Sequence, residues 1–151
     1  MPPSEAYGKR DVEELRIWKN EGFFGVTLPV MFRQEGASAA TALNYTAPFF
    51  IAQRDYQLIS VTERHEVAAT DMGAVTMMLN KVPSGTAPAS GTAMLTAGLS
   101  LKTTANTNQS GSLVTTAGGL LVPRGYALSF VTTGTLTDVQ GVTASLILKA
   151  V

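Results

Sequence analysis

The clearest pattern along the chain is an alternation of apolar and polar side chains between residues 56 and 82. Successive side chains of a strand point to opposite faces, so the alternation predicts β-structure. A break at residues 71–73 divides the stretch into two strands joined by one turn. One face of the first strand is predicted to carry Ile59, Val61, Glu63, His65 and Val67. One face of the second carries Val75, Met77 and Leu79. The stretch therefore predicts a half-buried hairpin of an antiparallel sandwich.

The same alternation begins earlier in the chain, on a face formed by Phe24, Val26, Leu28, Val30 and Phe32. Pro29 cannot donate a ladder hydrogen bond, so this strand is expected at a sheet edge or at a bulge. Residues 34–47 predict a loop, residues 49–51 a short buried run, and residues 83–91 a surface loop rich in Pro and Gly. Further strands are expected at residues 93–95, 99–102, 112–116, 120–122, 126–132 and 142–150, with a loop at 103–111.

No helical pattern follows residue 21. Eight or so short strands separated by Gly, Pro and Asn turns predict an all-β fold, an antiparallel β-sandwich or jelly roll. The last two strands again have apolar faces, which carry Tyr126, Leu128 and Phe130 in one strand and Val142, Ala144, Leu146 and Leu148 in the other.

The first 21 residues differ in kind, because they hold nine of the 22 charged side chains. Val12, Leu15 and Trp18 follow one another at intervals of three, and Asp11 can cap a helix that starts there. We therefore predict an N-terminal arm or short helix, residues 1–21, and a β-sandwich domain, residues 22–151. A helix of two turns is marginal alone in water, so its apolar side chains need a surface, either on the chain's own sandwich or on another protein.

Composition excludes several classes of function. The 11 basic and 11 acidic residues give no net charge, which argues against attraction to nucleic acid or to an anionic membrane. The chain has no cysteine, so disulfides, thiolate metal sites and a catalytic cysteine are excluded. No apolar run is long enough for a membrane span and residues 1–5 do not form a secretory signal, which predicts synthesis in the cytoplasm.

His65 is the only histidine, so any catalytic triad or imidazole metal site would have to use it. No Gly-x-Ser-x-Gly turn accompanies it. Glu63 and His65 share a strand face and could form a metal site with Asp71, but jelly-roll metalloenzymes of the cupin type need two or more histidines. We therefore predict no catalytic residue, no metal and no cofactor.

The expected role of Glu63 and His65 is structural. We expect them to face inward near a sheet end and to satisfy each other, or else to line a trimer axis. A buried pair of this kind would make assembly sensitive to pH. A His65→Ala trimer with an unchanged pH profile would rule out that hypothesis.

Four stretches carry a resemblance to known proteins: residues 49–52, 60–65, 87–91 (Ala-Pro-Ala-Ser-Gly) and 121–128 (Leu-Val-Pro-Arg-Gly-Tyr-Ala-Leu). They resemble virion proteins of tailed phages, namely the small jelly-roll head decoration (cement) proteins and head-fibre base domains. The resemblance covers roughly residues 22–151. It implies a homotrimer on the outer surface of the capsid, with a terminal arm that crosses neighbouring subunits of the major capsid protein.

The favoured hypothesis is a structural protein that decorates and stabilises a phage capsid. Its contacts with the capsid are assigned to apolar side chains of the arm and the residues after it: Val12, Leu15, Ile17, Trp18, Phe23 and Phe24. A head-fibre or carbohydrate-binding module is the alternative, although one Trp and four Tyr supply few sugar-stacking rings. A cupin-like enzyme is the third reading, and the single histidine weakens it.

Overall fold

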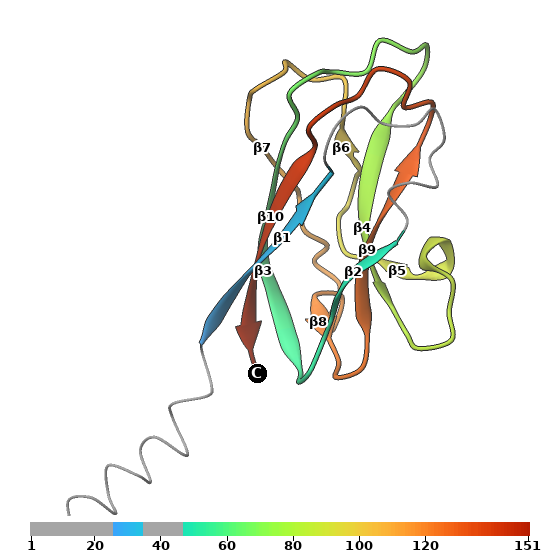
Figure 1. The fold of residues 1–151 in the computed structure, drawn as a ribbon. Helices are drawn as coiled ribbons and strands as arrows, with labels where there is room; N and C mark the ends of the chain where they lie inside the picture. The colour runs from blue at the N-terminus through green and yellow to red at the C-terminus, as the bar shows by residue number, and fades with distance from the viewer. Residues whose placement is uncertain (1–25, 35–46) are drawn as a thin grey trace, which may run out of the picture.

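The computed structural model describes residues 26–34 and 47–151, which form two antiparallel sheets packed face to face (Figure 1). The strand order is β1-β10-β3-β7 in the first sheet, with β8 also paired to β3. It is β2-β9-β4-β5 in the second sheet, with β6 also paired to β4. The first sheet contains β1 (Thr27–Arg33), β3 (Tyr56–Arg64), β7 (Gln109–Ser110), β8 (Leu121–Val122) and β10 (Thr143–Ala150). The second contains β2 (Pro48–Ile51), β4 (Thr76–Val82), β5 (Thr92–Ala93), β6 (Leu99–Ser100) and β9 (Ala127–Thr133).

The connections identify the architecture as a jelly roll. The chain passes from one sheet to the other after β1, β2, β3, β6, β8 and β9, and its first described strand pairs with its last. This order confirms the predicted all-β sandwich of jelly-roll type. The core between the sheets consists of Leu, Val, Met, Ala and Phe side chains, the largest of which is Phe130. Phe32 and Phe49 pack against Phe130 with ring centroids 5.3 and 5.2 Å away, which closes the sandwich along β1 and β2.

The predicted hairpin between residues 56 and 82 is wrong. Both strands exist, but β3 and β4 lie in opposite sheets, and residues 65–75 carry the chain across the sandwich. A hairpin loop has about two to five residues, and this connection is longer. The alternating pattern therefore predicted the strands correctly and their pairing incorrectly.

The inner face of β3 changes phase at Ile59. Ile147 pairs with Ser60 and Leu148 with Leu58, so Ile59 is an extra residue without a partner on β10. Such a β-bulge turns the strand. As a result Leu58 is 1% exposed while Ile59 is 43% exposed, the reverse of the predicted face. Val61, Glu63 and His65 face inward as predicted, whereas Val67, beyond the end of the strand, is exposed.

β1 lies at a sheet edge, as Pro29 predicted. Ala150 N donates to Val26 O and Gln34 N donates to Val142 O. The backbone N–H and C=O groups of the even-numbered residues of β1 therefore point toward β10, and those of the odd-numbered residues point away from it. Pro29 therefore faces the open edge, where its missing N–H costs no ladder hydrogen bond.

Three local predictions differ from the structure. Residues 112–116 form no strand and contribute only an isolated bridge between Leu95 and Leu113. The strand β7 lies instead at residues 109–110, inside the predicted loop, where it pairs with Thr62 and Glu63 of β3. A short 3-10 helix, Pro88–Ser90, occupies part of the loop predicted at residues 83–91. The predicted arm and helix, residues 1–21, lie outside the described residues.

Candidate functional site

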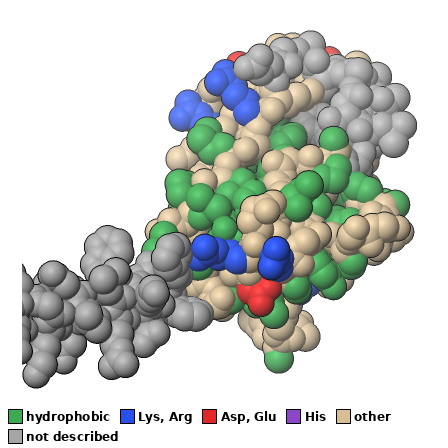
Figure 2. Space-filling view, turned by 60° about the horizontal axis from the view of Figure 1, so that its bottom comes forward, with side chains coloured by type: hydrophobic (Ala, Val, Ile, Leu, Met, Phe, Trp, Pro, Cys, Tyr) green, Lys and Arg blue, Asp and Glu red, His purple; other side chains and the backbone are tan. Residues whose placement is uncertain are grey.

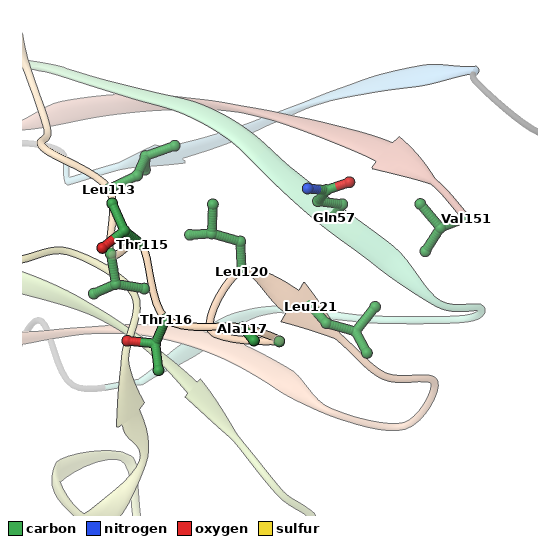
Figure 3. A pocket seen from close by; sticks show the side chains of 10 residues that line it. Gln57, Leu113, Thr115, Thr116, Ala117, Leu120, Leu121 and Val151 are labelled. Carbon is green, nitrogen blue, oxygen red and sulfur yellow. The ribbon is translucent and has the colours of Figure 1, made fainter.

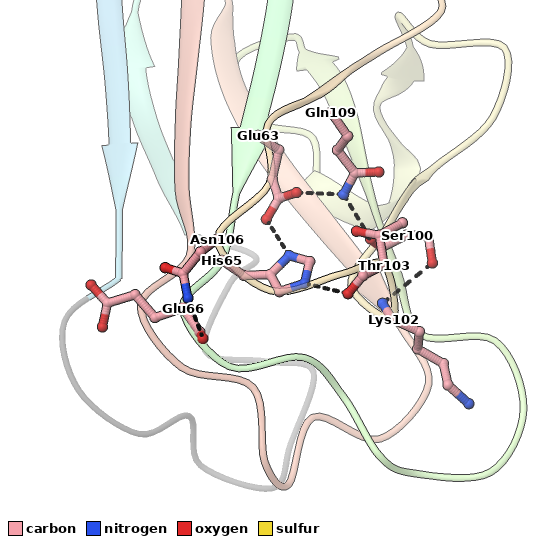
Figure 4. A network of polar contacts seen from close by, with 8 residues as sticks. All are labelled: Glu63, His65, Glu66, Ser100, Lys102, Thr103, Asn106 and Gln109. Carbon is pink, nitrogen blue, oxygen red and sulfur yellow. Dashed lines mark hydrogen bonds and ion pairs between the residues drawn. The ribbon is translucent and has the colours of Figure 1, made fainter.

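The only histidine belongs to a buried polar cluster, formed by Glu63, His65, Ser100, Thr103 and Gln109 (Figure 4). His65 Nδ1 lies 2.9 Å from Glu63 Oε1, and His65 Nε2 lies 3.1 Å from the carbonyl oxygen of Thr103. Both side chains are 0% exposed. The two ring nitrogens thus face a carboxylate oxygen and a carbonyl oxygen.

The second carboxylate oxygen of Glu63 accepts a hydrogen bond from Gln109 Nε2. The same amide nitrogen lies 2.6 Å from Ser100 O, and Thr103 Oγ1 donates to Ser100 O at 3.2 Å. β3, β7 and the segment after β6 are therefore joined by hydrogen bonds between side chains and to backbone carbonyls. A buried ion pair needs such additional hydrogen bonds to offset its desolvation.

This arrangement supports a structural role for the pair. Both side chains are 0% exposed within one chain, which favours the inward-facing pair over the alternative of a trimer axis. Asp71 does not join them, since its carboxylate accepts hydrogen bonds from Thr137 N and Oγ1. Among the described residues, no group of three or more His, Asp or Glu side chains could hold a metal ion. The effect of the pair on the pH dependence of assembly stays a prediction.

An apolar groove lies beside Val151, which follows β10 (Figure 3). Its volume is about 700 Å³, and it is lined by Gln57, residues 113–118, Leu120, Leu121 and Val151. No charged side chain lines it. Leu121 is 38% exposed and Val151 is 44% exposed, so solvent reaches these apolar side chains.

One wall of the groove is held in place by Lys81. This side chain crosses from β4 of the second sheet and donates from Nζ to Gly118 O at 2.7 Å and to Leu121 O at 2.9 Å. Burial lowers the pKa of the Lys81 ammonium below its usual 10.5. Two backbone hydrogen bonds also fix the wall, from Gly119 N to Thr116 O and from Leu58 N to Leu120 O. The groove is thus built into the fold.

Sequence reasoning missed both the groove and the role of Lys81. The segment 112–116 was predicted as a strand, and Lys81 stood in an alternating strand with nothing to mark its partners. One signal was available in the sequence: Lys81 continues the inward-facing series Val75, Met77 and Leu79. A lysine at such a position needs acceptors for its ammonium group, such as backbone carbonyl oxygens.

The opposite end of the sandwich carries a fixed loop with an apolar tip. Met72 is 98% exposed. Lys102 Nζ donates to Asp71 O at 2.7 Å and to Gly73 O at 3.1 Å, which holds the residues on both sides of Met72.

The surface seen when the lower end of Figure 1 is brought forward carries many hydrophobic side chains and few charged ones (Figure 2). Within residues 26–34 and 47–151, no helix has the length and apolar character needed to cross a membrane.

The residues predicted to contact a capsid all lie outside the described part of the chain: Val12, Leu15, Ile17, Trp18, Phe23 and Phe24. The structure does show where the described chain begins. Val26 is hydrogen-bonded to Ala150, next to Val151. This end of the sandwich is opposite the connection between β3 and β4, which contains Met72. The described chain therefore begins at the end of the sandwich where Val151 lies.

Comparison with known proteins extends the description of the fold. No family model matches the chain, and no curated protein matches it significantly. A solved structure is similar, a chain of the "Cyanophage Pam1 capsid asymmetric unit", with a TM-score of 0.50 and 15% sequence identity. The match covers 87% of this chain and 90% of that chain. At this identity the similarity concerns the fold.

Proposed function

We propose that the protein is a structural component of a phage virion that decorates and stabilises the capsid, binding subunits of the major capsid protein as a homotrimer on the outer surface. The observation that carries this proposal is the fold likeness to a chain of a cyanophage capsid, because it spans 87% of this chain and 90% of the other. A shared fold alone does not set function. The side-chain chemistry of this chain supports the same class of role.

The described residues offer means of binding rather than of catalysis. The only imidazole is sealed in the buried polar cluster, and no charged side chain lines the groove. Binding by such a surface depends on burial of apolar area, worth about 25 cal/mol per Å². Three copies joined in one trimer would strengthen weak single contacts through their raised effective concentration. We accordingly propose a role without enzymatic activity.

The arm is the proposed capsid contact. Its apolar side chains, including the only tryptophan, are candidates for anchor residues at an interface. Because the described chain begins at Val26, beside Val151, the proposal turns this end of the sandwich toward the capsid and the Met72 loop away from it.

Co-sedimentation with capsids tests the proposal. The probe is the purified head of the phage that encodes the chain, prepared without this protein. The full chain is expected to sediment with heads, and deletion of residues 1–21 is expected to abolish most of this binding. Trp18→Ala should weaken binding at least tenfold, the loss expected when an interface anchor is truncated, whereas the neighbouring Lys19→Ala serves as the matched control and should change it little.

Two results would contradict the proposal. Absence of the full chain from sedimented heads at any concentration would overturn the capsid-binding role. Undiminished binding by the chain without residues 1–21 would leave the capsid-binding role standing and overturn the assignment of the arm.

A further inference from the structure

The apolar groove has features of a preformed binding site for a hydrophobic segment. Its wall is fixed by Lys81 and by backbone hydrogen bonds before anything binds, so little ordering remains to be done on binding. Its lining contains leucine, valine, alanine, threonine, glycine and glutamine, and no charged side chain. A volume of about 700 Å³ falls in the range of sites that enclose a ligand of several hundred daltons, and accommodates two or three large side chains.

The position of the groove selects the occupant. Val26, Ala150, Tyr56 and Val122 lie in one continuous row across the first sheet, and the groove lies at the far end of that row, by Leu121 and Val151. Three steps between neighbouring strands amount to about 14 Å. Trp18 precedes Val26 by eight residues, which can span about 26 Å when extended. The arm of the same chain can therefore reach the groove.

We propose that the apolar groove binds residues 12–18 of the chain's own N-terminal arm, with Trp18 as the side chain that enters it. The chemistry matches, because the segment offers four apolar side chains and no charged side chain lines the groove. The four are Val12, Leu15, Ile17 and Trp18. Attachment to the same chain favours this occupant over a free one, since it raises the effective concentration into the millimolar range.

The consequence for assembly rests on the proposed function. The side chains assigned to the capsid are covered in the groove while the protein is free, and the capsid competes with the groove for them. Covering the apolar side chains of the arm in this way keeps them from associating non-specifically with other proteins.

The single tryptophan makes the docking measurable without any capsid. Quenching of Trp18 fluorescence by acrylamide is compared between the full chain and a peptide of residues 1–21. In the full chain we expect emission at shorter wavelength and a quenching constant several-fold smaller than in the peptide. Ala117→Glu and Leu121→Glu place a carboxylate in the groove and should restore the quenching of the peptide. Met72→Glu, at the opposite end of the sandwich, is the matched control and should leave the protection unchanged.

Each other outcome counts against the docking. Equal quenching in the full chain and the peptide overturns it. Protection that survives both groove variants shows that Trp18 is buried elsewhere, and protection lost on dilution assigns the groove to the arm of a second copy. Ala117 is exposed, so the first variant remains informative if Leu121→Glu fails to fold, which circular dichroism reports. Because no capsid takes part, failure of docking and failure of capsid binding are read separately.

Discussion

At the scale of single residues, the buried polar cluster links Glu63 and His65 to Gln109 and Thr103 through shared hydrogen bonds. The Glu63 carboxylate is hydrogen-bonded to His65 and to Gln109, and both side chains lose a partner if it is removed. We expect Glu63→Ala to lower the free energy of unfolding by about 3–5 kcal/mol, the usual cost of breaking a buried ion pair. Urea unfolding followed by circular dichroism measures it.

Glu66→Ala is the control for that measurement. It removes a carboxylate three residues away whose side chain is exposed, and we expect a change within about 0.5 kcal/mol. Equal losses in the two variants would show that the cluster contributes no more than an ordinary surface position.

Lys81 presents the second prediction at this scale. Loss of its two hydrogen bonds in Lys81→Met should lower stability by about 1–3 kcal/mol at neutral pH. The exposed Lys149→Met is the matched control, because it removes the same charge from the outer face of β10. If the two variants have the same free energy of unfolding, the hydrogen bonds between Lys81 and the groove wall do not contribute to stability.

The lowered pKa of Lys81 adds a dependence on pH. Between its pKa in the fold and 10.5, the unfolded chain binds more protons, so stability rises with pH across that window. Below the window the amine is charged in both states and the cost of its burial is present in full. The difference in unfolding free energy between wild type and Lys81→Met should therefore widen as pH rises through the window. A constant difference would contradict the sign.

At the scale of elements, the turn after β9 makes a close approach that only glycine permits. Gly134 has φ +91°, and a Cβ there would lie 2.3 Å from Ala74 O and 3.1 Å from Val75 Cα. Gly85 has a similar φ of +81° with nothing within 4 Å of a Cβ, which makes it the matched control. Gly134→Ala should cost about 1–3 kcal/mol more than Gly85→Ala, from overpacking. Thermal unfolding of the two variants compares them, and equal melting temperatures would show that the turn moves freely.

Alternation along the chain predicted elements better than it predicted their partners. The strands with long alternating stretches, β1, β3, β4, β9 and β10, were expected nearly where they lie. Side-chain period alone cannot show which sheet a strand joins, because that depends on pairing with distant residues, and so β3 and β4 were taken for a hairpin. The bulge at Ile59 has no local signal either, since the irregularity arises from pairing with β10.

The candidate sites show the same limit. Glu63 and His65 were correctly placed on an inward face, because they follow the alternation of β3. Their partners Thr103 and Gln109 come from loops and from a two-residue strand that no pattern marks. The groove could not be predicted from the sequence, because its residues come together only when β8 pairs with β3.

At the scale of the whole molecule, the proposed capsid role calls for several copies acting together. We expect the free protein to be a homotrimer, with a mass by light scattering three times the 15.9 kDa of one chain. Dilution should reveal whether trimers dissociate before capsid binding is lost. A mass of one chain at every concentration would contradict the trimer, and the capsid would then have to gather the copies itself.

The pairing of the first and last described strands also decides where added sequence would emerge. Val26 and Val151 lie at one end of the sandwich, so a peptide fused after Val151 would emerge beside Val26, on the side that the proposal turns toward the capsid. The Met72 loop, pinned by Lys102 at the far end, offers the better point for displaying a foreign epitope outward. A foreign peptide meant for display is therefore better inserted in the Met72 loop than fused after Val151.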